Sequence, residues 1–468
     1  MPDTDILTTL YRACNPLLPA TPEFYVDCSE ARGSNAFTKQ FCKDLGMADT
    51  KLKRLFSGHI GSGKSSELQH LRGTLSEHAA ITPHKRYFSV LMDANEYLNE
   101  ADVAVTDILL AIVAEISDAF RTELGISLED KYFKKRWDEV KNLFLSPVEL
   151  SEGEFSPVPN LKVKFKQMQT DPELRKKVRE RLREQTASLL DEINLIITAA
   201  RLELKKHSTA SEITPYEDMV LILDNFEKMN HLAGHAEGAP SHKALFIDNA
   251  REFLKLDVHL VLTVPLTLAR SEGQLASVYG KAPFVLPMIK AEEREKHQRY
   301  QPGHDKMRDI VQRRMGKTPL DAVFDADALD FLITYCGGDI RGLMAYAQQA
   351  ATEVDQPPID LSAAHRALRQ TIAYKTAAIR PGQWRKMAEL ERSPNQQIDN
   401  EDEDYRKMLQ DVNIVEYLNS VDSASPFDHA ECWYAVHPII RQASSFKLAL
   451  ADLDAEKAQQ AAAPVTKS

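Results

Sequence analysis

The sequence has few cysteines and no long apolar run, and each shortage excludes a class of protein. Its five cysteines in 468 residues are odd in number, scattered and without any C-x-x-C spacing, which argues against a disulfide framework or a zinc site. We expect them to be small buried apolar residues in a reducing compartment. The N-terminus is acidic and no apolar stretch reaches the length of about 18 residues that spans a bilayer. We therefore expect a cytoplasmic protein with neither signal peptide nor membrane span.

Basic residues are also in the minority. The chain carries 58 Lys and Arg against 69 Asp and Glu, a net charge of −11. This balance argues against a dedicated nucleic-acid coat protein, although it is compatible with a local basic face. Hydrophobic residues at 43% and charged residues at 27% are values of a globular protein. At this length we expect about two to four domains with sizeable cores.

The most informative motif is a phosphate-binding loop. Its residues are Gly58, His59, Ile60, Gly61, Ser62, Gly63, Lys64 and Ser65, a complete G-x-x-x-x-G-K-[ST] sequence that Ser66 follows. Glycines let the backbone N–H groups turn toward phosphates, and the loop opens onto a helix N-terminus that favours an anion. An apolar run over 52–56 predicts a strand before the loop, and the leucines after it predict a helix. The motif predicts nucleoside triphosphate binding at 58–66, with Lys64 at the β- and γ-phosphates and Ser65 on Mg²⁺.

An acidic motif follows a second apolar run. Residues 219–223 are five consecutive apolar residues, which is typical of a central parallel strand, and Asp224 comes at the carboxyl end of this run. A carboxylate there can coordinate the Mg²⁺ that Ser65 touches, and Glu227 is placed to deprotonate an attacking water. An apolar run followed by D-x-x-E is a weak signal alone. Downstream of a complete phosphate-binding loop, it predicts a nucleotide hydrolase.

Two further residues are candidates for contact with the γ-phosphate. Thr263 lies in the next predicted strand, 259–264, where its hydroxyl either senses the γ-phosphate or merely suits a β-strand. Both interpretations stay open. Arg270 follows this strand, where the nucleotide of a neighbouring subunit would meet it as an arginine finger. Lys281 is less suited, because a guanidinium gives planar bidentate contact with phosphate.

The order of predicted strands and helices indicates an α/β fold, a P-loop NTPase with a mainly parallel sheet. The predicted segments are an N-terminal lead-in at 1–50, an ATPase core at 51–290 with a helical insertion at 126–213, a helical lid at 291–376, a small winged-helix-like module at 380–447, and a disordered tail at 448–468. The only interruption expected in the lid is Gly337-Gly338. The tail is rich in alanine and glutamine, and terminal segments of this kind are often disordered.

Charge is distributed unevenly among these segments. The winged-helix-like module holds eight Lys and Arg against twelve Asp and Glu, whereas contact with nucleic-acid phosphates needs a positive surface. We therefore expect this module to contact protein. A basic run at 162–183 lies in the insertion, but glutamates are interleaved with it, which is typical of a solvated helix face. Nucleic-acid contact at this run is the alternative.

Together these motifs resemble those of the AAA+ superfamily. The resemblance covers residues 50–375 and includes a G-G-D-x-R sequence, Gly337 to Arg341, at the start of a lid helix. It is greatest to the branch that contains origin-recognition-type ATPases and the STAND signal-transducing ATPases. The resemblance implies ATP and Mg²⁺ as cofactors, Arg341 as the lid arginine that contacts the γ-phosphate, and a winged helix after the lid. It also implies a homo-oligomer that controls a separate effector protein, as in prokaryotic anti-phage defence.

The sequence thus predicts an ATP-hydrolysing molecular switch, with three alternatives. A DNA-associated ATPase in replication, partitioning or transposition would share the core and the lid. A small-molecule kinase would also use a phosphate-binding loop, but it needs neither Glu227 nor a large lid. A scaffold that holds nucleotide without turnover is the third. The resemblance implies ATP in preference to GTP, and the sequence has no N-K-x-D guanine signature.

Overall fold

The computed structural model describes residues 3–34, 36–77, 85–99, 103–128, 185–210, 214–229, 241–294, 297–419 and 431–462, together with positions 171, 173, 176, 179 and 180. The chain divides into two compact units. We call Thr38–Ser57 with His70–Phe284 the sheet unit, and Met1–Phe37 with Gly58–Gln69 and Val285–Ser468 the loop–lid unit. No helix among the described residues is long and apolar enough to cross a membrane.

Parallel strands form the centre of the sheet unit. The strands are β1 (Lys53–Gly58), β2 (Arg86–Asp93), β3 (Tyr216–Asp224), β4 (His259–Thr263) and β5 (Phe284–Leu286). Their order is β2-β3-β4-β1-β5, and β2–β3, β3–β4 and β4–β1 are parallel pairs. β3 and β4 are buried along almost their whole length, as expected of apolar central strands. The predicted α/β class with a mainly parallel sheet is confirmed.

The register brings the carboxyl ends of the strands to one edge. Leu223 of β3 pairs with Leu262 of β4, and Thr263 pairs with Phe56 of β1. Asp93, the last residue of β2, pairs with Asp224, the last residue of β3. Because parallel strands end on the same side, the sheet unit gathers two aspartates and Thr263 at this edge.

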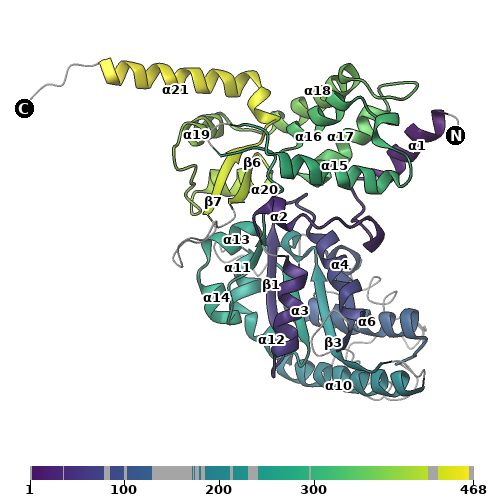
Figure 1. Cartoon of the computed structure of the whole chain (residues 1–468). Coiled ribbons are helices and arrows are strands. Elements are labelled where there is room, and N and C mark those ends of the chain that lie inside the picture. Colours follow the sequence, from purple (N-terminus) through teal and green to yellow (C-terminus); the bar gives the residue numbers. More distant parts are fainter. Residues whose placement is uncertain are drawn as a thin grey trace, which may run out of the picture. The chain divides into compact units, whose positions relative to one another are not determined.

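Helices complete the sheet unit. They are α3 (Phe37–Met47), the end of α4 (Lys64–Ser76), α5 (Ala94–Tyr97), α6 (Val105–Leu124), α10 (Thr186–Ala210), α11 (Ser241–Lys243), α12 (Ala250–Leu254), α13 (Leu266–Ser271) and α14 (Gln274–Tyr279). α6 and α10 pack on each other (Figure 1). Phe120 of α6 meets Phe88 of β2 with ring centroids 5.1 Å apart. α6 ends at Gly125, whose φ of 67° suits a left-handed helix cap. The rest of the predicted insertion at 126–213 lies mostly outside the described residues.

The lid helices belong to the loop–lid unit. They are α15 (Gln301–Met315), α16 (Ala326–Cys336), α17 (Ile340–Ala351) and α18 (Leu361–Ala377), and α1 (Asp3–Ala13) packs on α15 and α17 (Figure 1). The predicted break at Gly337-Gly338 is present, with φ of 59° and 80°. The expectation of a single break is wrong. Gly316 ends α15 and Pro319 follows it, while Asp360 caps α18 after a second gap at 352–360.

The C-terminal module also belongs to the loop–lid unit. It contains α19 (Pro381–Glu391), α20 (Glu403–Gln410), the antiparallel hairpin β6 (Ile414–Asn419) and β7 (Glu431–Val436), and α21 (Ser444–Ala462). The predicted helix and the two strands after it are therefore present, and residues 420–430 between the strands lie outside the described residues. The rings of Tyr417 and Trp433, 4.8 Å apart, fill the centre of the hairpin. The exact domain boundaries given in the sequence analysis stay predictions.

The tail differs from its prediction. Residues 448–462 are helical because they continue α21, and only 463–468 lie outside the described residues. α21 packs on α19 through the ion pairs Arg385–Glu456 at 2.8 Å and Arg392–Asp454 at 2.6 Å. Alanine and glutamine have high helix propensity, but they are also common in disordered termini. The composition therefore suits both a helix and a disordered tail, and the contacts with α19 favour the helix.

The N-terminal segment between α1 and β1 has little regular structure. It contains a single turn of 3-10 helix, Pro22–Phe24, and the proline suits the first position of a helical turn. α2 (Ser29–Arg32) follows and ends at Gly33 with φ of 69°. Four of the five cysteines are buried as predicted, and the fifth, Cys432, is half-buried.

Candidate nucleotide-binding site

The phosphate-binding loop joins β1 to α4 and depends on its glycines. Gly61 and Gly63 have φ of 84° and 93°, in the left-handed region that side chains rarely adopt. A Cβ atom on Gly61 would lie 2.0 Å from Oδ1 of Asp339, so even alanine would clash there. These conformations turn successive N–H groups in one direction, which is what an anion-binding loop needs.

Polar side chains of the loop suit a phosphate ligand. Nζ of Lys64 donates hydrogen bonds to the carbonyl oxygens of Gly58 and His59, both at 3.0 Å, and the residue is 6% exposed. Oγ of Ser62 is buried, and among the described residues it has no hydrogen-bond partner. A buried cation and an unsatisfied hydroxyl on one loop are the groups that a phosphate chain would satisfy. The loop therefore fits a nucleoside triphosphate.

The other predicted loop residues have different environments. Ser65 is half-buried in the first turn of α4, and the side chain of Ile60 is 40% exposed. Oγ of Ser66 accepts a hydrogen bond from the N–H of Ala20 at 2.9 Å. Nε2 of His59 accepts one from the N–H of Glu416 in β6, also at 2.9 Å. The side chains of His59 and Ser66 are thus hydrogen-bonded within the protein.

The lid touches the loop at the N-terminus of α17. The N–H groups of Ile340 and Arg341 donate to the carbonyl oxygen of Gly61 at 3.0 and 3.4 Å. Asp339 caps the helix by accepting from the N–H of Gly342 at 2.8 Å, and burial raises the pKa of this carboxyl. The side chain of Arg341 is exposed, and its Cβ lies 3.3 Å from where a Cβ on Gly61 would stand. The predicted lid arginine thus lies beside the phosphate-binding loop.

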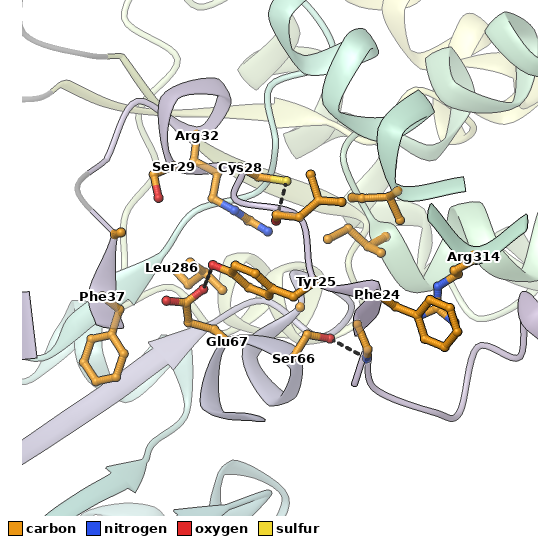
Figure 2. A pocket seen from close by; sticks show the side chains of 16 residues that line it. Phe24, Tyr25, Cys28, Ser29, Arg32, Phe37, Ser66, Glu67, Leu286 and Arg314 are labelled. Carbon is orange, nitrogen blue, oxygen red and sulfur yellow. Dashed lines mark hydrogen bonds between the residues drawn. The ribbon is translucent and has the colours of Figure 1, made fainter. Parts of the chain in front are cut away.

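A pocket opens next to the loop (Figure 2). Its walls come from the N-terminal segment, from Gly63, Ser66 and Glu67 at the start of α4, and from lid residues that include Arg314. The phenol of Tyr25 crosses the pocket and donates to Oε2 of Glu67 at 2.7 Å (Figure 2). The pocket contains about 550 Å³ of space including its open mouth. Its aromatic lining beside a phosphate-binding loop suits a nucleoside.

The acidic motif forms a fixed turn in the sheet unit. Asp224 ends β3 and is 6% exposed, and Asn225 after it has a left-handed φ of 64°. Nδ2 of Asn225 donates to Oδ1 of Asp93 at 2.9 Å, and the N–H of Phe226 donates to Oγ1 of Thr263 at 2.9 Å. Glu227 follows, half-buried, in the 3-10 turn Phe226–Lys228. Asp93 and Thr263 therefore hold the turn that carries Glu227.

This contact gives Thr263 a structural task that neither sequence interpretation included. Its oxygen accepts a hydrogen bond from the turn, and its side chain is fully buried. Asp93 and Arg32 were also missed. Asp93 gives no signal because its partner, Asn225, is 132 positions away in the sequence. For Arg32 the only sequence signal is the Arg-Gly pair that ends α2.

The remaining candidates lie on different parts of the molecule. Arg270 is half-buried in the last turn of α13, and Lys281 donates to Asp44 at 2.7 Å. Of the basic run at 162–183, Lys176 and Arg179 are described. Lys176 is exposed, and Nε of Arg179 donates to Oδ2 of the buried Asp107 at 2.9 Å. Most of the run lies outside the described residues. His437 of the C-terminal module is buried, and its Nδ1 accepts from the N–H of Ile439 at 3.3 Å.

The structure is similar to solved structures of ORC and Cdc6 chains. A chain in the structure of Drosophila ORC bound to DNA is 11% identical with a TM-score of 0.39, and the match covers 82% of this chain and 72% of that one. Cdc6p from Pyrobaculum aerophilum is also 11% identical with a TM-score of 0.35, and the match covers 92% of this chain and 99% of that one. No protein-family model and no curated protein matches the sequence. Likenesses this distant concern the fold and say nothing of what this chain binds.

Proposed function

We propose that the chain binds and hydrolyses Mg-ATP and uses this cycle as a molecular switch. The observation that carries the proposal is the phosphate-binding loop, in which left-handed glycines surround a buried lysine. The acidic turn at the end of β3 supports hydrolysis, because it places a carboxylate pair after a central strand of a parallel sheet. The loop itself begins where β1 ends, two strands from β3 in the sheet order.

Each residue has a role in this proposal. Lys64 binds the β- and γ-phosphates, and Ser65 and Asp224 hold Mg²⁺, which neutralises charge that develops on the phosphates. Glu227 accepts the proton of the attacking water. Thr263 and Asp93 keep the turn in place, so that the carboxylate of Glu227 needs no reorganisation before it acts.

The output of the switch is a movement of the lid and the C-terminal module. The carbonyl of Gly61 accepts hydrogen bonds from the N-terminus of α17, and the side chain of His59 accepts one from β6. Two elements outside the phosphate-binding loop therefore contact the loop directly. A change in loop conformation on hydrolysis would alter both contacts, and Arg341 would lose the γ-phosphate. Control of a separate effector protein, in prokaryotic anti-phage defence, is the finer part of this proposal and rests on the sequence resemblance alone.

A DNA-associated ATPase is the second candidate. It is favoured by the basic run at 162–183, in which the described Lys176 is exposed, whereas Arg179 is paired with Asp107. The two distant structural likenesses do not decide between the candidates. DNA binding that weakens steeply as salt rises, together with ATPase activity that DNA stimulates, would favour this function over the effector switch.

Phosphate release and mass photometry of the wild-type protein test the proposed function. We expect ATP hydrolysis that requires Mg²⁺, and a larger assembly when Mg-ATP is present. If the protein hydrolysed ATP but Mg-ATP did not increase the mass of its assembly, the proposal would be restricted to a monomeric ATPase or to one that works in a hetero-complex. Absence of any ATP binding would overturn it.

Arg270 is predicted to act on the nucleotide of a neighbouring subunit. Arg270→Ala should lower the ATPase rate at least about tenfold, because an arginine finger stabilises charge in the transition state. Mixing this variant with the Glu227→Gln variant, which is also expected to be impaired, should restore activity, since each supplies the residue that the other lacks. The matched control is Arg251→Ala, an exposed arginine of the same unit. A mixture as inactive as its components would exclude action between subunits.

A further inference from the structure

Arg32 is a buried cation to which the proposed function gives no role. It is the last residue of α2 and is 6% exposed. One terminal nitrogen, Nη2, donates to the carbonyl oxygen of Ser62 in the phosphate-binding loop at 2.6 Å, and the other, Nη1, donates to that of Pro287. Among the described residues no carboxylate forms an ion pair with it. The guanidinium is thus held by two neutral oxygens.

This arrangement leaves both charge and donors in excess. A guanidinium has five N–H donors, and the two carbonyls use two of them. Burial lowers the pKa of Arg32, and the nearby Glu67 and Asp27, which act in the opposite direction, do not compensate for it. Burying a charge without a paired ion is costly unless another group neutralises it. An anionic ligand beside Arg32 would offset this cost.

The position of the guanidinium indicates which ligand this is. Figure 2 shows Arg32 pointing from α2 into the pocket, between Cys28 and Tyr25. Its Nη2 lies 3.6 Å from where a Cβ on Gly63 would stand, and Gly63 directly precedes Lys64. The cation therefore lies against the phosphate-binding loop, on the side where the pocket opens. All of these residues belong to the loop–lid unit.

We propose that Arg32 is a nucleotide-binding residue, which fixes the loop through the carbonyl of Ser62 and gives its remaining donors to the phosphate chain. This inference rests on the proposed function for the nucleotide, but not on its hydrolysis. The opposing explanation is a brace that only holds the loop and never touches the ligand. The two explanations differ in whether the positive charge matters for ligands with phosphates.

Two substitutions separate charge from hydrogen bonding. Arg32→Gln keeps an amide that can donate to the Ser62 carbonyl but is neutral, and Arg32→Lys keeps the charge on a flexible chain. Affinities for adenosine, AMP, ADP and ATP are measured by competition with a fluorescent nucleotide. With Arg32→Gln we expect about 10- to 100-fold weaker binding of ADP and ATP, as for a lost charge-assisted bond, and adenosine within about twofold of wild type. Arg32→Lys should bind ADP and ATP at least about threefold more tightly than Arg32→Gln, because it keeps the positive charge.

Several outcomes would overturn the proposal. If Arg32→Gln bound ADP and ATP as tightly as the wild type, Arg32 would only hold the loop. The same would follow if the variant lost equal affinity for adenosine and for ATP. Arg32→Lys binding ATP as weakly as Arg32→Gln would also show that the charge is not used. Arg12→Gln, an exposed arginine of the same unit, is the matched control, and thermal unfolding without nucleotide checks that each variant is folded. A wild-type protein that binds none of the four ligands would instead refute the proposed function, and this inference with it.

Discussion

Replacing Lys64 with alanine is expected to weaken ATP binding at least about 100-fold. The ammonium group is almost completely buried, and its two carbonyl partners at 3.0 Å belong to the loop itself. Its charge is therefore fixed where the loop would meet the β- and γ-phosphates. Charge-assisted hydrogen bonds contribute about 1.5–3 kcal/mol each, and two of them account for a loss of this size. Isothermal titration calorimetry with Mg-ATP measures the effect.

The control for Lys64→Ala must separate lost binding from lost structure. Lys317→Ala removes the same charge from an exposed site in the same unit and should leave the ATP affinity unchanged. Lys64→Met keeps the apolar part of the side chain, so it should unfold at nearly the wild-type temperature while it fails to bind ATP. ATP affinity that is unchanged in a folded Lys64→Ala protein would contradict both the site and the proposed function.

The parts of the fold that the sequence predicts well are those with a local signal. The five apolar residues from Met219 to Leu223 lie within β3, and the glycine-rich loop lies between β1 and α4 as expected. The start of β3 at Tyr216 was missed because Asp218 is polar. Its carboxylate is paired with Lys51 and with Arg201, which lies 17 positions earlier on α10. The start of β3 therefore depends on residues that are distant in the sequence, and the local sequence around Asp218 carries no strand signal.

The tail shows the same limit for helices. Composition alone did not separate a helix at 448–462 from disorder, because the surface of α21 is mostly polar or alanine. Burial of Phe446 and Leu453 and the ion pairs to α19 favour the helix, and the ion pairs join residues 62 and 71 positions apart in the sequence. Helix propensity can be read from the sequence, but the helix on which α21 packs cannot.

The candidate site was predictable where its chemistry depends on residue type and spacing. The loop, Asp224, Glu227 and Arg341 are all found from motifs. Arg32 and Asp93 were not, because each acts through a partner that lies far away in the sequence: a backbone carbonyl of Ser62 and the side chain of Asn225. Thr263 was found, but the hydrogen bond from the N–H of Phe226 could not be, since it depends on the left-handed conformation of Asn225.

Glu227→Gln is expected to stop hydrolysis while ATP stays bound. Glutamine has almost the same size and can form hydrogen bonds, but it cannot accept a proton from water, and the loss of a general base lowers kcat about 10²- to 10⁴-fold. The turn itself should not change, because it is held through Asn225 and Phe226 by Asp93 and Thr263. Phosphate release gives kcat, and a filter assay with labelled ATP gives the affinity, which should stay within about threefold of wild type.

The matched control for Glu227→Gln lies on the same strand as the acidic motif. Glu217 is exposed near the start of β3, at the opposite end from Asp224, and pairs with Lys85 at 3.5 Å. Glu217→Gln makes the same chemical change and should leave kcat unchanged. If the switch depends on oligomers, mass photometry should also find Glu227→Gln trapped in the larger assembly after ATP is added. Full hydrolysis by Glu227→Gln would assign the base to another residue, whereas loss of ATP affinity would show that Glu227 acts in binding rather than in catalysis.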